Sequence, residues 1–249
     1  MFQNKYAQKV ERKLTKFIPK RTQTIKGEEA IVSFSFDDFP TSAMSDAGPI
    51  LAEFGMTASY YLAGGLMGKK NDDMPICDKE LVRKTSDAGH EIGCHTYGHL
   101  SCQAASLEEL QNDLSRNEEI IKNITNIVPS SFAYPFGKVS FSSRTLIGQR
   151  FSVARGIHEG LNSGKTDLLN LKANAIYSNV FSKEKYIALL QQAKKEGGWL
   201  IFYTHDVTAR PGKFGCTPEE FQTVVNLVAE AGVRVLPVKH AAGYFAFQK

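Results

Sequence analysis

The sequence predicts an α/β fold in which parallel strands form a sheet or barrel that helices cover. Short runs rich in β-branched and aromatic residues alternate along the chain with amphipathic stretches. The strand-like runs are apolar almost throughout, which is typical of parallel strands buried on both faces. The chain has 249 residues, 42% of them hydrophobic and 22% charged, so it is long enough for one domain with a sizeable core.

The expected strands and helices follow from residue type and periodicity. Ser106 with Glu109, and Thr217 with Glu220, have the spacing of a capping box at the start of a helix. The segment GGLMGKKNDDMP (64–75) is the best candidate for a mobile loop. Strands are expected at 30–36, 57–63, 90–96, 131–135, 151–155, 199–205 and 233–238, and helices at 106–124, 182–198 and 217–232.

Basic residues are concentrated at the N-terminus. Residues 1–26 carry eight Lys or Arg against Glu11 alone, a net charge of +7, so the whole-chain value of +4 leaves −3 for residues 27–249. We therefore expect a basic arm over 1–26 and one main domain over 27–249. A mildly acidic main domain argues against nucleic-acid binding, because such domains spread basic residues over a working face.

The arm also has helical periodicity. Apolar residues recur every three or four positions, with basic residues between them, which is typical of a basic amphipathic helix. Such a helix could lie on an anionic membrane, pack on the main domain, or contact a second subunit. The apolar stripe consists of Phe2, Tyr6, Val10, Leu14, Phe17 and Ile18.

Cysteine usage and hydropathy indicate the compartment. The sequence has no apolar run of about 18 residues, and its N-terminus lacks the apolar centre of a signal peptide. Cys77, Cys94, Cys102 and Cys216 have no CxxC spacing, and we expect free thiols, with a Cys94–Cys102 pair as the alternative. These features predict a cytoplasmic protein.

Polar residues follow three of the predicted strands. Asp37 and Asp38 follow the first, His95 and His99 the third, and His205 the sixth. The ends of parallel strands gather at one edge of a sheet or barrel. Two histidines at this spacing and a carboxylate can hold a divalent ion with open positions for water, while a second carboxylate acts as a base.

These motifs resemble those of the polysaccharide deacetylases, a family of carbohydrate esterases that includes the chitooligosaccharide deacetylases of nodulation. SFDDFP (35–40) resembles their Thr-Phe-Asp-Asp-Gly-Pro motif, and HTYGH (95–99) matches their His-(Ser/Thr)-x-x-His motif. FAYPFG (132–137) is a variant of their third motif, and IFYTHDV (201–207) is similar to their last. The resemblance spans roughly residues 27–240. It implies a distorted, TIM-like (β/α)7 barrel and metal-dependent removal of an N-acyl group, usually acetyl, from an amino sugar in an oligo- or polysaccharide.

The resemblance also implies roles for individual residues. Asp38, His95 and His99 bind the metal, with Zn²⁺ as the first expectation and Co²⁺, Ni²⁺, Mn²⁺ or Fe²⁺ as alternatives. Asp37 is the general base, and His205 protonates the departing amine. The oxyanion is held by the metal and by the backbone N–H of Phe136.

Two positions depart from the family pattern, and one supporting residue of that pattern is not identified. Phe39 replaces a usual Gly, and it is expected to narrow the entrance or to form an aromatic wall for a sugar ring. Ala133 stands where an Arg commonly orients the base; Arg155, at the end of the next strand, is the first candidate to replace it, and Arg144 and Arg150 are the others. The Asp that commonly supports the acidic His is not identifiable, and Asp167 is a weak candidate.

Other aromatic and imidazole side chains near the motifs need separate interpretation. Tyr97, Tyr134 and Trp199 could stack on sugar rings, although aromatic residues at strand ends are core residues at least as often. His90 is expected to pack structurally at a strand start, and His158 and His240 at the surface.

Three alternative functions stay open from the sequence. A non-haem iron oxygenase also uses two His and one carboxylate, but it has no need for a second Asp or a distal His. A silent sugar-binding module would not need Asp37 and His205. A deacylase or deformylase of a lipid-linked amino sugar at the inner membrane face would account for the basic arm.

Overall fold

A parallel sheet forms the centre of the molecule. The computed structural model describes residues 5–15 and 17–247, with the side chains of residues 5 and 6 left aside. Within these residues the sheet has the order β10-β11-β2-β3-β6-β7-β8, and β12 also pairs with β2. Its strands are β2 (Ile31–Phe36), β3 (Ser59–Leu62), β6 (Glu91–Cys94), β7 (Ser131–Ala133), β8 (Val153–Arg155), β10 (Asn174–Ala175), β11 (Trp199–Thr204) and β12 (Arg234–Val235).

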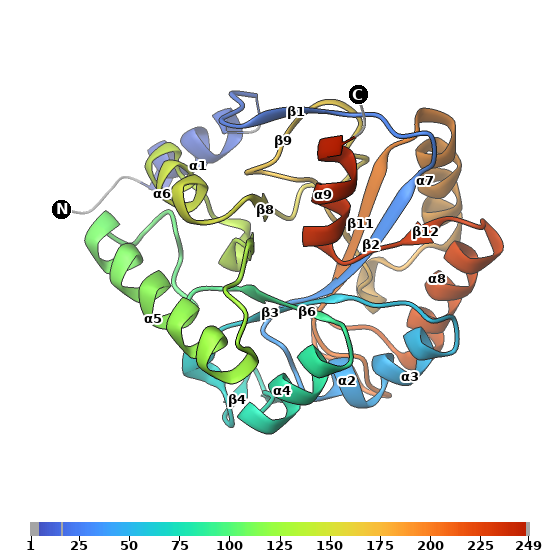
Figure 1. Cartoon of the computed structure of the whole chain (residues 1–249), viewed down its shortest axis with the longest axis horizontal. Helices are drawn as coiled ribbons and strands as arrows, with labels where there is room; N and C mark the ends of the chain where they lie inside the picture. The colour runs from blue at the N-terminus through green and yellow to red at the C-terminus, as the bar shows by residue number, and fades with distance from the viewer. Residues whose placement is uncertain (1–4, 16, 248–249) are drawn as a thin grey trace.

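The sheet curls until its two outer strands approach each other (Figure 1). Leu171 forms an isolated parallel bridge with Arg155 of β8, and Asn174 then pairs with Phe202 of β11. The segment between them therefore links the two ends of the sheet. This arrangement confirms the predicted α/β class and its TIM-like barrel architecture.

Helices cover the outside of the sheet, and both predicted capping boxes are present, at Ser106 with Glu109 and at Thr217 with Glu220. Three 3-10 turns follow strand ends or connecting segments: η1 (Gly64–Leu66), η2 (Pro135–Gly137) and η3 (Ser178–Val180). The helices are α1 (Lys5–Leu14), α2 (Ser42–Ser45), α3 (Ala47–Ala52), α4 (Lys79–Asp87), α5 (Leu107–Thr125), α6 (Phe141–Arg150), α7 (Lys183–Glu196), α8 (Pro218–Glu230) and α9 (Val238–Phe247).

Two apolar clusters lie on opposite faces of the strands. Val32, Phe34 and Phe36 of β2 pack toward the covering helices, whereas Ile31 belongs to the cluster with Trp199 and the α9 residues. Neighbouring residues of a strand point to opposite faces, so a strand buried on both faces is mostly apolar, and its few polar side chains are hydrogen-bonded, as Ser33 and Ser35 of β2 are. This explains the continuous apolar runs of the sequence.

The N-terminal segment is joined to the main domain before residue 26. Strand β1 (Thr22–Ile25) pairs antiparallel with β9 (Gly164–Asp167). Residues 22–25 therefore belong structurally to the main domain, and the arm that precedes them is shorter than expected. Of the predicted apolar stripe, Phe2 lies outside the described residues, as does the side chain of Tyr6.

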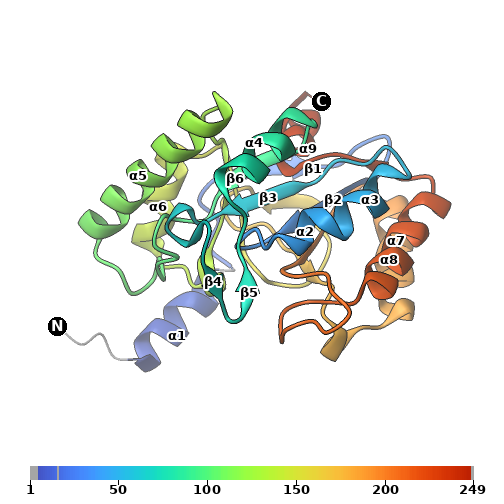
Figure 2. The same cartoon turned by 90° about the horizontal axis from the view of Figure 1, so that it is seen from below.

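The segment expected as a mobile loop contains a short hairpin. Strands β4 (Lys70–Asn71) and β5 (Met74–Pro75) pair antiparallel, joined by Asp72 and Asp73, both with positive φ. A two-residue turn of this kind holds the hairpin tightly. Figure 2 shows it projecting from the same side of the molecule as α1.

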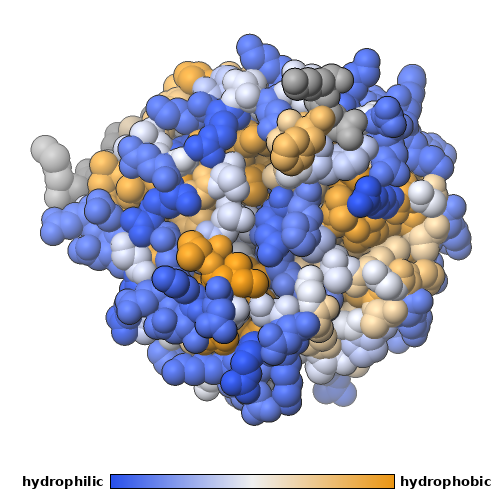
Figure 3. Space-filling model, viewed as in Figure 1, coloured by the Kyte–Doolittle hydropathy of each residue, from blue (hydrophilic) through white to orange (hydrophobic). Residues whose placement is uncertain are grey.

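The face of the molecule drawn in Figure 3 is predominantly polar. On the face drawn in Figure 3, hydrophilic side chains surround a few apolar patches. No helix in the described part of the chain is long and apolar enough to cross a bilayer.

Candidate metal and catalytic site

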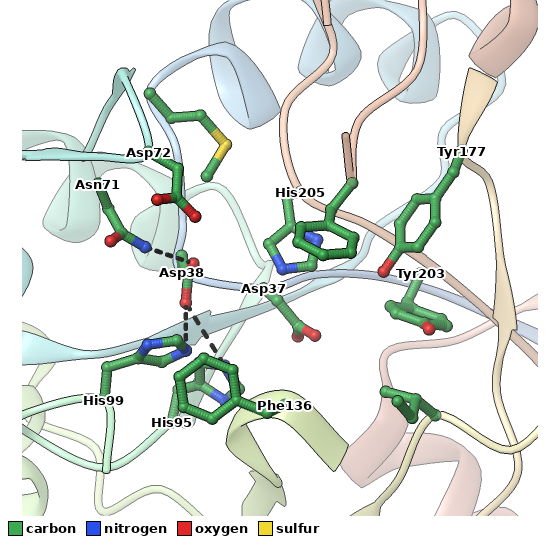
Figure 4. Close-up of a pocket in the computed structure, with 13 residues that line it drawn as sticks. Asp37, Asp38, Asn71, Asp72, His95, His99, Phe136, Tyr177, Tyr203 and His205 are labelled. Carbon is green, nitrogen blue, oxygen red and sulfur yellow. Dashed lines mark hydrogen bonds and ion pairs between the residues drawn. The ribbon is translucent and has the colours of Figure 1, made fainter. Parts of the chain in front are cut away.

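A pocket of about 480 Å³ lies where several strands of the sheet end. Its volume is within the usual range for small-ligand sites. One side is polar and the other is largely apolar and aromatic (Figure 4). The lining consists of Asp37, Asp38, Asn71, Asp72, Met74, His95, His99, Phe136, Ile157, Tyr177, Tyr203, His205 and Phe214.

Asp38, His95 and His99 converge on one point of this pocket (Figure 4). Asp38 Oδ1 lies 3.4 Å from His95 Nε2 and 3.1 Å from His99 Nε2. The three ligand atoms are all within 4.8 Å of one another. Asp38 follows β2 and both histidines follow β6, so the strand ends that the motifs mark do meet.

The chemistry of these three side chains fits a divalent cation. The Nδ1 of His95 lies 2.8 Å from the carbonyl oxygen of Ala133, which places the proton on Nδ1 and leaves the Nε2 lone pair for a metal. Burial lowers the pKa of His95 to about 3, so its ring is neutral. Burial also raises the pKa of Asp38 to about 6, the behaviour of a buried carboxyl group that a cation would stabilise.

Asp37 has a different partner from Asp38. Its carboxylate accepts a hydrogen bond from Arg155, which is fully buried at the end of β8. Burial alone would raise the pKa of Asp37, but the nearby Arg155, His95 and His205 outweigh it and lower that pKa below the ordinary value. Two adjacent carboxylates thus sit in distinct environments, one facing a cation site and one paired with a guanidinium.

The Arg155 guanidinium is itself held between two aromatic rings. Its central carbon lies 4.8 Å from the ring centroids of both Tyr61 and Tyr203. Arg155 is also the register partner of Ala133 on β7. In a parallel sheet, register partners point to the same face, so Arg155 projects from the strand next to the one that lacks the family's Arg.

Several site residues have a left-handed backbone conformation, which turns their side chains toward the pocket. Asp38 has a φ of 61°, His99 of 53° and Phe136 of 59°. Residues other than Gly adopt such angles at a cost, and they concentrate at functional sites. Here each one turns the chain sharply just after a strand, which brings successive side chains to the same pocket.

His205 and Phe136 complete the pocket from two other loops. The His205 ring lies 5.5 Å from the Phe214 ring and 6.0 Å from the Tyr177 ring, across the pocket from His99 (Figure 4). The Phe136 ring is half exposed and packs 4.5 Å from the His99 ring. Backbone hydrogen bonds in this turn come from the amides of Gly137 and Lys138.

Four aromatic residues expected to contact sugar do not line this pocket. Phe39 is fully buried against Tyr60, so it neither narrows the entrance nor forms a wall. Tyr134 is buried, and its hydroxyl donates to the Leu169 carbonyl. Trp199 lies at the start of β11, at the opposite end from the site, and donates to Ser33. Tyr97 is not among the lining residues, and its ring packs under Arg116.

The remaining candidates have structural partners elsewhere. Arg144 donates to Asp167 and Arg150 to Glu118, so neither reaches Asp37. Asp167 is engaged by Arg144 and by the backbone of the N-terminal segment, so it does not support His205. His90 accepts from the Ala58 amide, as expected for a packed structural histidine.

Sequence reasoning missed several pocket residues. Asn71 of the β4–β5 hairpin donates to Asp38 Oδ2 at 2.9 Å, and Asp72 lies beside it. The Asp72-Asp73 turn signal was present in the sequence, but nothing indicated that the hairpin folds over the site. Tyr203 could have been found, because it lies near the end of β11, two residues before His205. Tyr177 gives no local signal.

Comparison with known proteins agrees with these observations. The sequence profile described as polysaccharide deacetylase matches residues 24–149, just over half of the chain. That range contains Asp37, Asp38, His95, His99 and Phe136, whereas Arg155 and His205 lie beyond it.

Two curated relatives are bacterial. "Putative polysaccharide deacetylase YxkH" of Bacillus subtilis (strain 168) is 26% identical over 117 residues, which cover 47% of this chain and 40% of the relative. "Peptidoglycan-N-acetylglucosamine deacetylase" of Bacillus cereus is 23% identical over 177 residues, which cover 69% of this chain and 58% of the relative. The chain thus spans about half the length of these relatives.

Solved structures show the same fold. The Bc1960 peptidoglycan N-acetylglucosamine deacetylase superposes with a TM-score of 0.63 at 15% identity, over 89% of this chain and 91% of that one. The fold and the matched profile together place the chain in a family: it is a member of the polysaccharide deacetylases.

Proposed function

We propose that this protein is a metal-dependent hydrolase that removes an N-acetyl, or another N-acyl, group from an amino sugar in an oligo- or polysaccharide. The observation that carries the proposal is that the adjacent carboxylates of Asp37 and Asp38 have different partners. Asp38 faces two neutral histidines, and Asp37 is held by a buried Arg155. The names of the relatives agree with this reaction class.

Asp38, His95 and His99 would hold the divalent ion, with Zn²⁺ as the first choice for a site of two imidazoles and one carboxylate. When bound, such an ion polarises a carbonyl group and lowers the pKa of water. Asn71 donates to the second oxygen of Asp38, which keeps the first oxygen directed at the histidines.

Asp37 would act as the general base. Its lowered pKa keeps it ionised, and the Arg155 contact fixes its orientation toward the pocket. It accepts a proton from the attacking water while the water oxygen bonds to the acyl carbon. The backbone N–H of Phe136 would donate to the negative charge that develops on the carbonyl oxygen.

His205 would complete the reaction as general acid. It lies across the pocket from the cation site, and in the proposed reaction it would face the sugar nitrogen. Its proton transfer lets the amide C–N bond break, which yields a free sugar amine and a carboxylate. Tyr177, Phe214 and Ile157 form an apolar side on which the acyl group or a sugar face can rest.

A second candidate within the same chemistry is a deacylase or deformylase of a lipid-linked amino sugar. The exposed apolar and basic side chains of α1 favour it, because they would suit an enzyme that works at a membrane. Four buried free cysteines agree with the reducing compartment expected from the sequence.

The test is product release from a small substrate panel. Purified protein, stripped with a chelator and reloaded with Zn²⁺, would be incubated with N-acetylated chitin oligosaccharides and with N-acetyl or N-formyl lipid-linked amino sugars. We expect acetate or formate release that chelation abolishes and that Asp37→Asn reduces. Release that is unaffected by both the chelator and Asp37→Asn would contradict the proposed function.

A further inference from the structure

Helix α1 presents its polar side to the protein and its apolar side to solvent. Glu11 Oε1 accepts a hydrogen bond from the Phe141 amide at 2.9 Å, and the Gln8 carbonyl accepts one from Gln103 at 2.6 Å. Val10 is 39% exposed and Leu14 is 46% exposed. Surface helices normally bury their apolar stripe against the core, so this orientation is the reverse of the usual one.

The turn after α1 continues the exposed apolar strip. Phe17 is 79% exposed and Ile18 is 50% exposed. Their backbone is held in place, because the buried Arg144 donates to the carbonyls of Thr15 and Ile18 and also pairs with Asp167. We call Val10, Leu14, Phe17 and Ile18 the α1 strip. The anchoring shows that its exposure is a property of the fold.

Basic side chains border the α1 strip. Lys9 and Lys13 each precede an apolar member of the strip, and Lys20 follows it; all three are exposed. None of them forms an ion pair with another residue in the described part of the chain. They lie within the segment of net charge +7 that precedes a main domain of net charge −3.

Helix α1 lies on the side of the molecule that carries the β4–β5 hairpin of the pocket. Gln103, which contacts α1, follows His99 by four residues, and Phe141 follows Phe136 by five. Helix α1 therefore rests on the two loops that carry these site residues. Figure 2 shows α1 on the same side of the molecule as the β4–β5 hairpin, which reaches into the pocket.

We propose that the α1 strip and its bordering lysines dock the pocket-bearing side of the protein onto an anionic lipid bilayer. Apolar side chains flanked by lysines are the chemistry that inserts shallowly among acidic headgroups. The pocket mouth then faces the membrane surface. This inference rests on the proposed function. With the pocket facing the membrane, the substrate class is an amino sugar that is attached to a lipid or held close to the bilayer.

Charge and size favour a membrane over a second copy of the chain. In a two-fold dimer, Lys9 and Lys13 would approach the same residues of the other copy and repel them. Four apolar side chains also offer much less than the roughly 800 Å² per partner of a standard stable interface.

Vesicle co-sedimentation tests the proposal without any activity measurement. The full chain would be mixed at low salt with vesicles of phosphatidylcholine alone or with added phosphatidylglycerol, and then at high salt. We expect sedimentation only with the anionic vesicles, and weaker sedimentation at high salt because the lysine contribution is screened.

Two paired variants separate the apolar and basic contributions. Leu14→Ser/Phe17→Ser and Lys9→Glu/Lys13→Glu should each weaken binding to anionic vesicles by about tenfold or more, with unchanged thermal stability because the side chains are exposed. The matched controls are Ile127→Ser/Val128→Ser, exposed at the opposite ends of the strands, and Lys183→Glu/Lys195→Glu on α7. Both controls should bind as the wild type does.

Several results would overturn the proposal. The full chain could stay in the supernatant with anionic vesicles at low salt, or the α1 variants could bind as tightly as their controls. A dimer in solution that Leu14→Ser/Phe17→Ser dissociates would assign the strip to a second copy instead. Asp37→Asn should bind vesicles normally, so a failure of membrane docking and a failure of the proposed chemistry can be told apart.

Discussion

Asp37 and Asp38 reach one pocket because the backbone passes from an extended strand at Asp37 to a left-handed conformation at Asp38. The Asp37 amide still donates to the Thr204 carbonyl of β11, as a strand residue does, at 3.0 Å. Asp38 and Phe39 have φ values of 61° and 55°, so the chain turns at once. Neighbouring side chains on a regular strand would point to opposite faces. The turn lets one carboxylate meet the histidines while the other meets Arg155.

Arg155 supplies the guanidinium that the family usually carries at position 133, and this exchange can be tested by placing an Arg at position 133 again. Arg155→Ala should lower kcat by about 10- to 100-fold with a smaller effect on KM, because it leaves Asp37 unoriented. Adding Ala133→Arg should restore part of kcat, since Ala133 and Arg155 are register partners. Steady-state kinetics and thermal melting of the single and double variants provide the measurement. A double variant that folds but recovers no activity would argue against the exchange.

His205 is expected to act without binding the metal. His205→Ala should retain the divalent ion, and its kcat should fall by roughly 10²- to 10⁴-fold, the usual scale for general acid–base catalysis. Metal analysis of the purified variant and turnover of an N-acetylated oligosaccharide test both parts. Loss of the ion in His205→Ala would instead make His205 a ligand.

At the scale of elements, the first strand and its turn are stabilised by an aromatic side chain in an unfavourable backbone conformation. Phe39 has positive φ and packs 4.6 Å from the Tyr60 ring, fully buried. The sequence suggested a role at the pocket entrance, because the family usually has Gly here. The structure shows that the side chain fills the space between the turn and β3.

Phe39→Ala should destabilise the fold by about 3–5 kcal/mol, through lost burial and the cavity that remains. Phe39→Gly should be less destabilising than Ala by about 1 kcal/mol, because Gly adopts positive φ without a steric penalty. The buried Phe34 of β2 is the matched control, and there Gly should be worse than Ala. Urea unfolding gives the four values. If Gly is more destabilising than Ala at position 39, as it is expected to be at position 34, the proposed backbone strain at Phe39 would be contradicted.

The strands could be predicted from the sequence better than the connections between them. Runs such as 30–36 and 199–205 are apolar because β2 and β11 are buried on both faces, so composition alone indicates them. Helices α4, α6 and α9, and the β4–β5 hairpin, were not predicted. The hairpin depends on tertiary contact, because Asn71 is fixed by Asp38, a residue 33 positions away.

The same limit applies to the site. The residues Asp37, Asp38, His95, His99 and His205 form recognisable motifs at strand ends, so their convergence could be expected. Tyr97, Tyr134 and Trp199 were candidates only because they lie near these motifs in sequence. Nearness along the chain does not fix the direction of a side chain, and all three have partners elsewhere and do not line the pocket.

At the scale of the whole molecule, the four cysteines are free and buried. Burial raises the pKa of all four thiols, to about 12 for Cys94 and Cys216. The thiolate is the reactive form, and it is therefore disfavoured in the native state at neutral pH.

A thiol reagent at pH 8 should leave the native protein essentially unlabelled, and after unfolding in guanidinium chloride all four cysteines should react. Mass spectrometry of both samples counts the labelled sites. Rapid labelling of the native protein would contradict the burial of the thiols. Failure of Cys94 and Cys102 to react after unfolding without reductant would indicate the disulfide that the structure does not have.

The division of labour between Asp37 and Asp38 is the central claim, and metal content measured together with turnover tests it most directly. Asp37→Asn should keep its divalent ion and lose kcat by about a hundredfold or more, because only the base is removed. Asp38→Asn should lose both the ion and the activity. Retention of the ion and of activity in both variants, or loss of the ion in Asp37→Asn, would contradict the account.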